Sequence, residues 1–157
     1  MIARHEYRID LSTWTMTSAR GVRRLTVDDV AELPGLMLAA YAGTTDDEGE
    51  TLTEAVEEIE GWLRNGGDLG ASFGAEIDGR LCAAALVAAT PVEVVLAYVI
   101  THPDHKRQGL GRRVVSGVLD GLQAGDTRAV HLWITEGNEP SERLFAGLGA
   151  KRVRALN

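Results

Sequence analysis

The sequence predicts an α/β protein whose mixed sheet is covered by helices, and three features of the chain support this class. Asp78-Gly79 separates two runs that favour strands, and this dipeptide readily adopts the positive φ angles of a tight hairpin turn. The run of residues 92–101 is long and mostly apolar, which is typical of a strand buried on both faces. Helical periodicity resumes after a glycine-rich segment, so strands and helices alternate toward the C-terminus.

The first seventy residues predict two strands and two helices. Alternating apolar and polar side chains indicate a half-buried strand at residues 6–14, and a second short strand is expected at 21–25. A helix at about 27–41 contains Pro34, which lacks a backbone N–H, so we expect a kink or two short segments. A second helix is expected from about 52 to 64, where a capping-box pattern precedes helical spacing.

The remaining elements follow the same two periodicities. In order, we expect hairpin strands at 72–77 and 80–89, a strand at 92–101, a helix ending at Ala124-Gly125, a strand at 130–135 and a short helix at 139–148. The last seven residues can form at most one strand. All 157 residues are expected to fold as a single domain.

Composition excludes several classes of partner. The chain has 16 Lys and Arg against 23 Asp and Glu, a formal charge of −7, so binding to nucleic acid or to an anionic membrane is not expected. The single Cys82 cannot form an internal disulfide or a cysteine-rich zinc site, and no metal site is predicted. No apolar leader or membrane span is recognisable, so a cytoplasmic location is expected.

The charges are unevenly distributed along the chain. Eight acidic residues and no basic residue lie between Asp46 and Glu60. Four basic residues lie in an acid-free stretch from Lys106 to Arg113. The protein is therefore predicted to have one acidic and one basic region rather than a uniformly acidic surface.

The basic stretch contains the clearest chemical motif, Lys106-Arg107-Gln108-Gly109-Leu110-Gly111, between a buried strand and a helix. Glycines let a ligand approach the main chain, and the first turn of a helix presents free N–H groups to an anion. Neither a Walker A loop nor a dinucleotide fingerprint is present. The motif predicts a phosphate-binding turn, although a plain strand-to-helix connection would also place glycines there.

A second motif lies at residues 135–150, after the next predicted strand, and the two motifs in this order resemble the GNAT superfamily of N-acetyltransferases. Residues 106–111 are similar to the family's pyrophosphate loop, Arg/Gln-x-x-Gly-x-Gly/Ala, with Lys106 where the family usually has Arg or Gln. Residues 135–150 are similar to the family's Asn-x-x-Ala-x-x-Leu-Tyr-x-x-x-Gly-Phe segment. The resemblance covers residues 92–150 and implies a central mixed, mostly antiparallel sheet flanked by helices. Relative to the family, this chain is expected to have an extra N-terminal strand and a short C-terminus.

The resemblance implies acetyl-CoA as cosubstrate and direct attack on its thioester by a primary amine of a small molecule or peptide. It also implies that the strands at 92–101 and 130–135 splay apart to hold pantetheine, with backbone N–H groups near 99–101 facing the developing oxyanion. The positions implied for cofactor binding are Val99, Ile100, Thr101, Lys106, Arg107, Gln108, Gly109, Leu110, Gly111, Arg112, Asn138 and Phe145.

The catalytic residues are less clear from the sequence. Phe145 stands where many family members have a tyrosine that protonates the CoA thiolate, so Ser141 or water would assist the leaving group instead. Asp46-Asp47-Glu48, with Asp47 as the candidate base, borders the acceptor site implied by the resemblance, but the same run also fits a solvated loop. Glu136 is a second candidate base, and Tyr98 is expected to pack in the core.

Two other functions remain open. One is a non-catalytic acyl-CoA sensor or assembly module with the same fold, which Phe145 favours. The other, an ATP-dependent phosphotransferase, lacks a Mg²⁺-binding signature. Family members usually have two strands after the last helix, and only one fits here. We therefore predict that the strand at 6–14 fills the vacancy, within the chain or across a homodimer.

Overall fold

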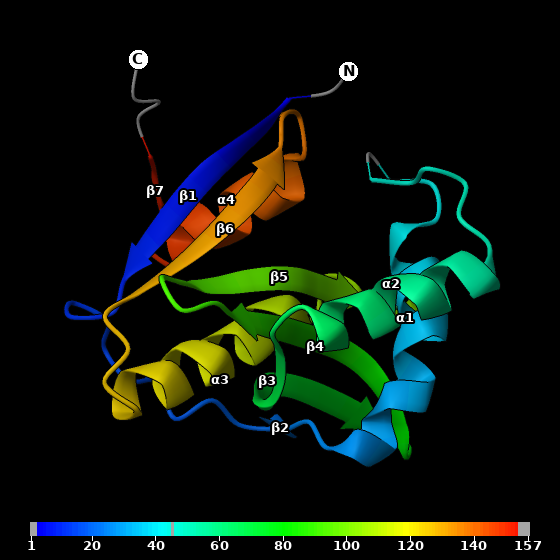
Figure 1. The fold of residues 1–157 in the computed structure, drawn as a ribbon, viewed down its shortest axis with the longest axis horizontal. Coiled ribbons are helices and arrows are strands. Elements are labelled where there is room, and N and C mark those ends of the chain that lie inside the picture. The colour runs from blue at the N-terminus through cyan, green and yellow to red at the C-terminus, as the bar shows by residue number, and fades with distance from the viewer. Residues whose placement is uncertain (1–2, 45, 154–157) are drawn as a thin grey trace.

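A computed structural model describes residues 3–44 and 46–153 of the chain. The elements are β1 (Arg4–Asp10), β2 (Arg23–Arg24), the 3-10 helix η1 (Val27–Glu32), α1 (Leu33–Tyr41), α2 (Leu52–Arg64), β3 (Gly67–Ile77), β4 (Arg80–Ala89), β5 (Val94–Thr101), the 3-10 helix η2 (Pro103–His105), α3 (Leu110–Ala124), β6 (Ala129–Thr135), α4 (Glu139–Gly147) and β7 (Lys151–Arg152). The strands form one mixed, mostly antiparallel sheet of order β2-β3-β4-β5-β6-β1-β7, which confirms the predicted α/β class (Figure 1).

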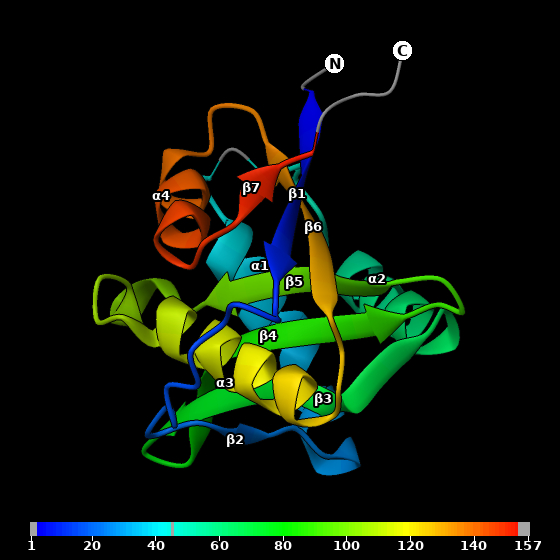
Figure 2. The same ribbon diagram turned by 90° about the vertical axis from the view of Figure 1, so that its left-hand side faces the viewer.

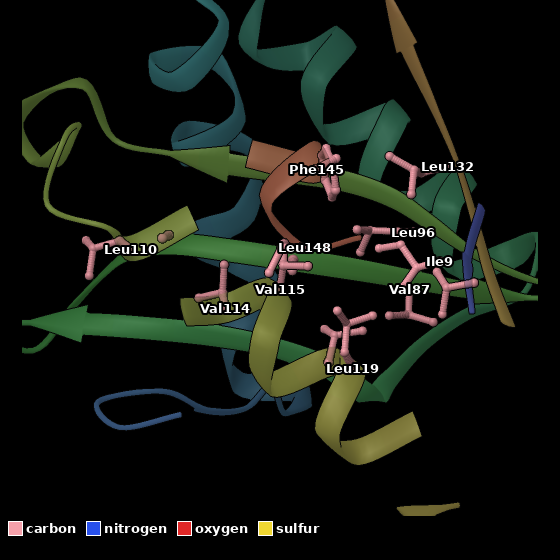
Figure 3. Close-up of a cluster of buried hydrophobic side chains, with 14 of the residues drawn as sticks. Ile9, Val87, Leu96, Leu110, Val114, Val115, Leu119, Leu132, Phe145 and Leu148 are labelled. Atoms are coloured by element: carbon pink, nitrogen blue, oxygen red, sulfur yellow. The ribbon is translucent and has the colours of Figure 1, made fainter. Parts of the chain in front are cut away.

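Helices cover both faces of this sheet and create two apolar cores. Side chains of α1 and α2 pack on one face against Ala84, Leu86 and Ile100. On the other face, α3 and α4 pack against the sheet; Figure 3 shows Val115 with Val87 in this cluster. Each fully buried aliphatic side chain contributes roughly 1.5–3 kcal/mol relative to exposure, so the two cores hold the helices firmly on the sheet.

The sheet divides where β5 meets β6. These two strands are parallel and pair at a single position, Val95 with His131, whereas the other neighbouring strands are antiparallel. Beyond that pair the strands diverge, and Figure 2 shows β6 and β1 turned steeply away from β5. The splay implied by the resemblance is therefore present, and it opens toward Thr101 and Thr135.

The N-terminal strand fills the predicted vacancy within the chain. β1 lies between β6 and β7 and is antiparallel to both, in a register that places Ile9 opposite Val130. It ends at Asp10 rather than near residue 14, because the Asp10 carboxylate accepts hydrogen bonds from the N–H and the hydroxyl of Ser12 and forms a turn. A dimer is not needed to complete this side of the sheet.

Local sequence signals account for where several helices and strands begin and end. Pro34 lies at the start of α1, directly after η1, so the predicted interruption of the first helix is confirmed. The strand expected from residue 92 begins at Val94, since Thr90 donates to and accepts from Glu93 in a turn. β2 is only two residues long, shorter than the strand expected at 21–25.

Asp29 ties the start of η1 to β2 and is a sensitive point for stability. Its buried carboxylate accepts from the Arg23 guanidinium at 2.8 and 2.9 Å and from the Thr26 N–H at 2.7 Å. We expect Asp29→Ala to lower the free energy of unfolding by about 2–4 kcal/mol at pH 7, because hydrogen bonds to charged groups are among the stronger ones. Urea unfolding measures this loss.

The contribution of the Asp29 carboxylate to the free energy of unfolding depends on pH. Hydrogen bonding from Arg23 holds the pKa of Asp29 below its usual value. Its contribution to stability is therefore present above about pH 4 and is lost as the pH falls through the lowered folded pKa. The difference between wild type and Asp29→Ala should shrink in acid, whereas Asp28→Ala, at an exposed neighbour, should change stability by less than about 0.5 kcal/mol. An equal effect at both positions would contradict this assignment.

Candidate active site

A cavity of about 550 Å³ lies where β5 and β6 separate, bounded also by α1, α2 and α4. Apolar side chains of both strands and of α4 line part of it, including Leu96, Leu132 and Phe145. The sheet thus provides an apolar wall at the point where its two halves part.

The opposite wall is strongly acidic. The carboxylates that line the cavity are Asp46, Glu48, Glu50, Glu54, Glu57 and Glu58, and among the described residues Arg4 is the one guanidinium of the lining. Three of these acids lie on α2 with three- and four-residue spacing, which places them on one face of the helix. The cavity therefore attracts cations and repels anions.

Asp46 joins the acidic loop to the far side of the cavity. Its carboxylate accepts from Thr135 Oγ1 at 2.8 Å and from Asn138 Nδ2 at 3.1 Å. Asn138 in turn caps α4, since its side-chain oxygen accepts from the Ser141 N–H. These hydrogen bonds connect the loop after α1 to the end of β6 and to the start of α4.

The glycine loop lies at the end of β5 and leads into α3. Gly109, the N-cap of α3, has a φ of +75° and no atom within 4 Å of the position that a Cβ would take. In the described part of the chain, the backbone N–H groups from 107 to 112 make no hydrogen bond of normal geometry to a protein acceptor. A run of free N–H groups at a helix start, among exposed basic side chains, is suited to an anion.

Neighbouring side chains hold this loop in place. Lys106 Nζ donates to the carbonyl of Ala40 in α1 at 3.4 Å, and Arg113 donates to the Gln108 carbonyl at 3.0 Å. Gly111 lies beside the end of β5, since its missing Cβ would be 3.6 Å from Thr101 Oγ1. The loop and the gap between the strands therefore meet.

The predicted cofactor positions divide into three groups. Val99, Asn138 and Phe145 line the cavity, and residues 106–112 form the adjoining loop and first turn of α3. Thr101 lies between them at the end of β5, half-buried. Ile100 is fully buried on the α1–α2 side, so only its main chain can face the gap.

The predicted catalytic residues are not brought together. Ser141 lines the cavity. Asp47 and Glu136 lie outside its lining. The Asp47 carboxylate accepts hydrogen bonds from the N–H groups of Gly43 and Gly49, which lowers its pKa. The Glu136 side chain is exposed, and its carboxylate lies 3.9 Å from His5 Nε2. Asp47 therefore braces its own loop, while its neighbour Asp46 faces the cavity.

Tyr98 is the functional candidate that sequence reasoning placed in the core alone. Its ring packs against the α1–α2 core, but the side chain also lines the cavity and its hydroxyl donates to the Glu58 carboxylate. Burial, followed by this carboxylate, raises the pKa of Tyr98 above its usual range. Tyr41, also in the lining, has its pKa raised mainly by burial.

Comparison with known families identifies the architecture. A family model described as the acetyltransferase (GNAT) family matches residues 37–150. The chain belongs to this family. The match spans the acidic loop, the splayed strands and the glycine loop, so the whole cavity except the β1 contribution lies within the GNAT region.

Solved GNAT structures share the fold at low sequence identity. A putative acetyltransferase from Novosphingobium aromaticivorans is 24% identical, with a TM-score of 0.72 over 98% of this chain and 61% of its own. A GCN5-related N-acetyltransferase from Sphaerobacter thermophilus is 14% identical, with a TM-score of 0.75 over 96% of this chain and 48% of its own. This chain thus spans about half to three fifths of those two proteins.

A further solved structure was obtained with a ligand. It is the PaiA N-acetyltransferase from Thermoplasma acidophilum in complex with coenzyme A, 14% identical, with a TM-score of 0.60 over 80% of this chain and 86% of its own. The ribosomal-protein-S18-alanine N-acetyltransferase from Escherichia coli is 21% identical, with a TM-score of 0.64 over 82% and 75% of the two chains. Among curated proteins, none matches this chain.

Two features are absent from residues 3–44 and 46–153. No helix there is long and apolar enough to cross a membrane. No group of three or more His, Cys, Asp or Glu side chains in that part of the chain could hold a metal ion.

Proposed function

We propose that this GNAT protein transfers an acetyl group from acetyl-CoA to a primary amine of a cationic small molecule or peptide. The observation that carries the proposal is the divergence of β5 and β6, with a loop of free N–H groups at one side and an acid-lined cavity at the other. An anionic donor and a cationic acceptor would thus approach the gap from separate, oppositely charged surfaces.

On the donor side, the loop at 106–111 would bind the CoA pyrophosphate through backbone N–H groups, aided by Lys106, Arg107 and Arg112. Main-chain groups of β5 at 99–101 face the gap where the strand has no partner and would hydrogen-bond pantetheine. The positive φ of Gly109 and the open space beside it let the backbone approach a phosphate closely.

On the acceptor side, the acidic wall supplies selectivity. A protonated amine that enters the cavity meets six carboxylates and one guanidinium, so cations are favoured over neutral or anionic acceptors. Asp46, held by Thr135 and Asn138, keeps part of this charge close to the end of β6.

Release of CoA proceeds without the tyrosine that many family members use. Phe145 is buried and apolar, so its side chain has no proton for the thiolate. A thiol with a pKa near ~8.5 is a tolerable leaving group, and Ser141 or water in the cavity would complete its protonation. The same phenylalanine is the observation that favours a non-catalytic CoA-binding module as the second candidate.

An assay of acetyl-CoA with amines of differing charge tests the proposal. Free thiol and acetylated product are followed with diamines, monoamines, neutral amides and peptides. We expect turnover that is fastest with cationic primary amines. CoA binding by calorimetry without thiol release for any amine would instead support the non-catalytic module, and thermal stabilisation by ATP but not by CoA would contradict both.

A further inference from the structure

A β-bulge in β5 determines which way Tyr98 points. In the pairing of β4 with β5, Leu86 lies opposite Tyr98 and Val87 lies opposite Leu96, so Ala97 is an extra residue without a partner. Consecutive side chains of a regular strand alternate between faces, but a bulge interrupts the alternation. As a result Ala97 and Tyr98 both face the α1–α2 side, while Leu96 and Val99 face the α3 side.

The bulge therefore aims the Tyr98 phenol into the acid-lined cavity beside the gap. There its hydroxyl donates to the carboxylate of Glu58 on α2. The other charged or titratable groups that line this cavity are Tyr41 on α1, Arg4 on β1, Glu54 and Glu57 on α2, and Asp46, Glu48 and Glu50 on the loop between the two helices. Tyr98 lies on the same strand as 99–101, where the thioester would bind.

A cavity that attracts a cationic amine also holds that amine in its protonated, unreactive form. Catalysis then needs a group that removes one proton from the ammonium before attack. Asp46 already accepts two side-chain hydrogen bonds, and Asp47 and Glu136 lie outside the cavity lining. Glu58 is exposed, so a proton that it receives can pass on to water.

We propose that Tyr98 and Glu58 act together as the proton acceptor for the amine, an inference that rests on the proposed acetyl transfer. One proton of R–NH₃⁺ passes to Tyr98 Oη while the phenolic proton of Tyr98 passes to the Glu58 carboxylate. Glu58 then releases that proton to water. The freed lone pair then bonds to the thioester carbonyl carbon. The carbon–sulfur bond breaks with its electron pair on sulfur, and a second proton from nitrogen ends on that sulfur.

This proton transfer accounts for three observations together. The phenol stays protonated at neutral pH, because its pKa is raised by burial and by Glu58, so it can donate to the carboxylate while its oxygen accepts from the amine. The bulge provides the direction, and α2 provides a carboxylate in contact with both the phenol and solvent.

The test compares Tyr98→Phe and Glu58→Gln with wild type across pH in the acetyl-CoA and diamine assay. We expect each variant to lose about 10²-fold or more in kcat at pH 7, with little change in CoA affinity measured by calorimetry. The loss should shrink as the pH approaches the pKa of the amine in solution, because the free base then no longer needs the pair. The double variant should be no slower than either single variant.

Glu60→Gln is the matched control, since Glu60 is an exposed acid of the same helix that lies outside the cavity lining. It should keep wild-type kinetics. Two results would overturn the role of the pair and leave the acetyltransferase function intact, provided that wild type turns over. The first is that the Tyr98 and Glu58 variants have the same kcat as wild type, and the second is that their loss in kcat is constant across pH. Absence of wild-type turnover with every amine would overturn both.

Discussion

Replacing Gly111 by glutamate is expected to weaken the binding of CoA severely while the protein stays folded. Gly111 lies in the first turn of α3, where a Cβ would make ordinary contacts with Thr101 Oγ1 at 3.6 Å and Leu144 at 3.8 Å. The added carboxylate would lie next to the free N–H groups that are proposed to bind the pyrophosphate. Like-charge juxtaposition costs several kcal/mol, so we expect affinity to fall by about 10²-fold or more.

Calorimetric titration with CoA measures this loss, and thermal unfolding confirms that the variant is folded. Gly35→Glu is the matched control, because Gly35 is also a helical glycine and lies outside the cavity lining; no atom lies within 4 Å of its missing Cβ, so a side chain fits there too. It should bind CoA as wild type does. If Gly111→Glu keeps wild-type affinity, the phosphate site has been placed on the wrong loop.

Reversing one charge on the acidic wall is expected to change acceptor selectivity without affecting CoA. Glu57 lines the cavity and is exposed on α2, so Glu57→Lys removes a negative charge and adds a positive one at little cost in folding. We expect kcat/KM to fall by about 10–100-fold for a diamine, and by less for a monoamine, because focused fields in charged clefts have effects of this size.

Steady-state kinetics at low and high salt provide the measurement. The loss should diminish as salt is added, since screening weakens the attraction in wild type and the repulsion in the variant. Glu60→Lys makes the same charge change on the same helix outside the cavity lining and should leave both acceptors unaffected. Equal losses for the two variants would show that the charge of the cavity does not select the acceptor.

Most of the fold could be predicted because its signals are local. The turn at Asp78-Gly79, the break at Pro34 and the glycine loop before α3 each depend on the conformational preferences of a few neighbouring residues. The place of β1 between β6 and β7 required a different argument, namely that one strand was missing after α4. Strand ends were less accurate: side-chain turns at Asp10 and Thr90 shorten β1 and β5, whereas β3 begins at Gly67, before the expected residue 72.

The site was only partly predictable, for a geometric reason. The positions of the loop and of the cavity-lining residues followed from motifs, but the orientation of single side chains did not. The sequence Asp46-Asp47 does not reveal that the first carboxylate binds Thr135 while the second accepts hydrogen bonds from its own loop. Alternation correctly places Tyr98 on the opposite face from Val99, against the α1–α2 core, but the sequence gives no sign that its hydroxyl reaches Glu58 in the cavity.

The central claim is that CoA binds in the gap between β5 and β6 and presents its thioester to the acid-lined cavity. A crystal structure of the chain with acetyl-CoA tests it most directly. We predict the pyrophosphate on the N–H groups of residues 107–112, pantetheine beside 99–101, and the acetyl group close to Tyr98. Density for CoA anywhere else, or an empty gap under saturating acetyl-CoA, would contradict it.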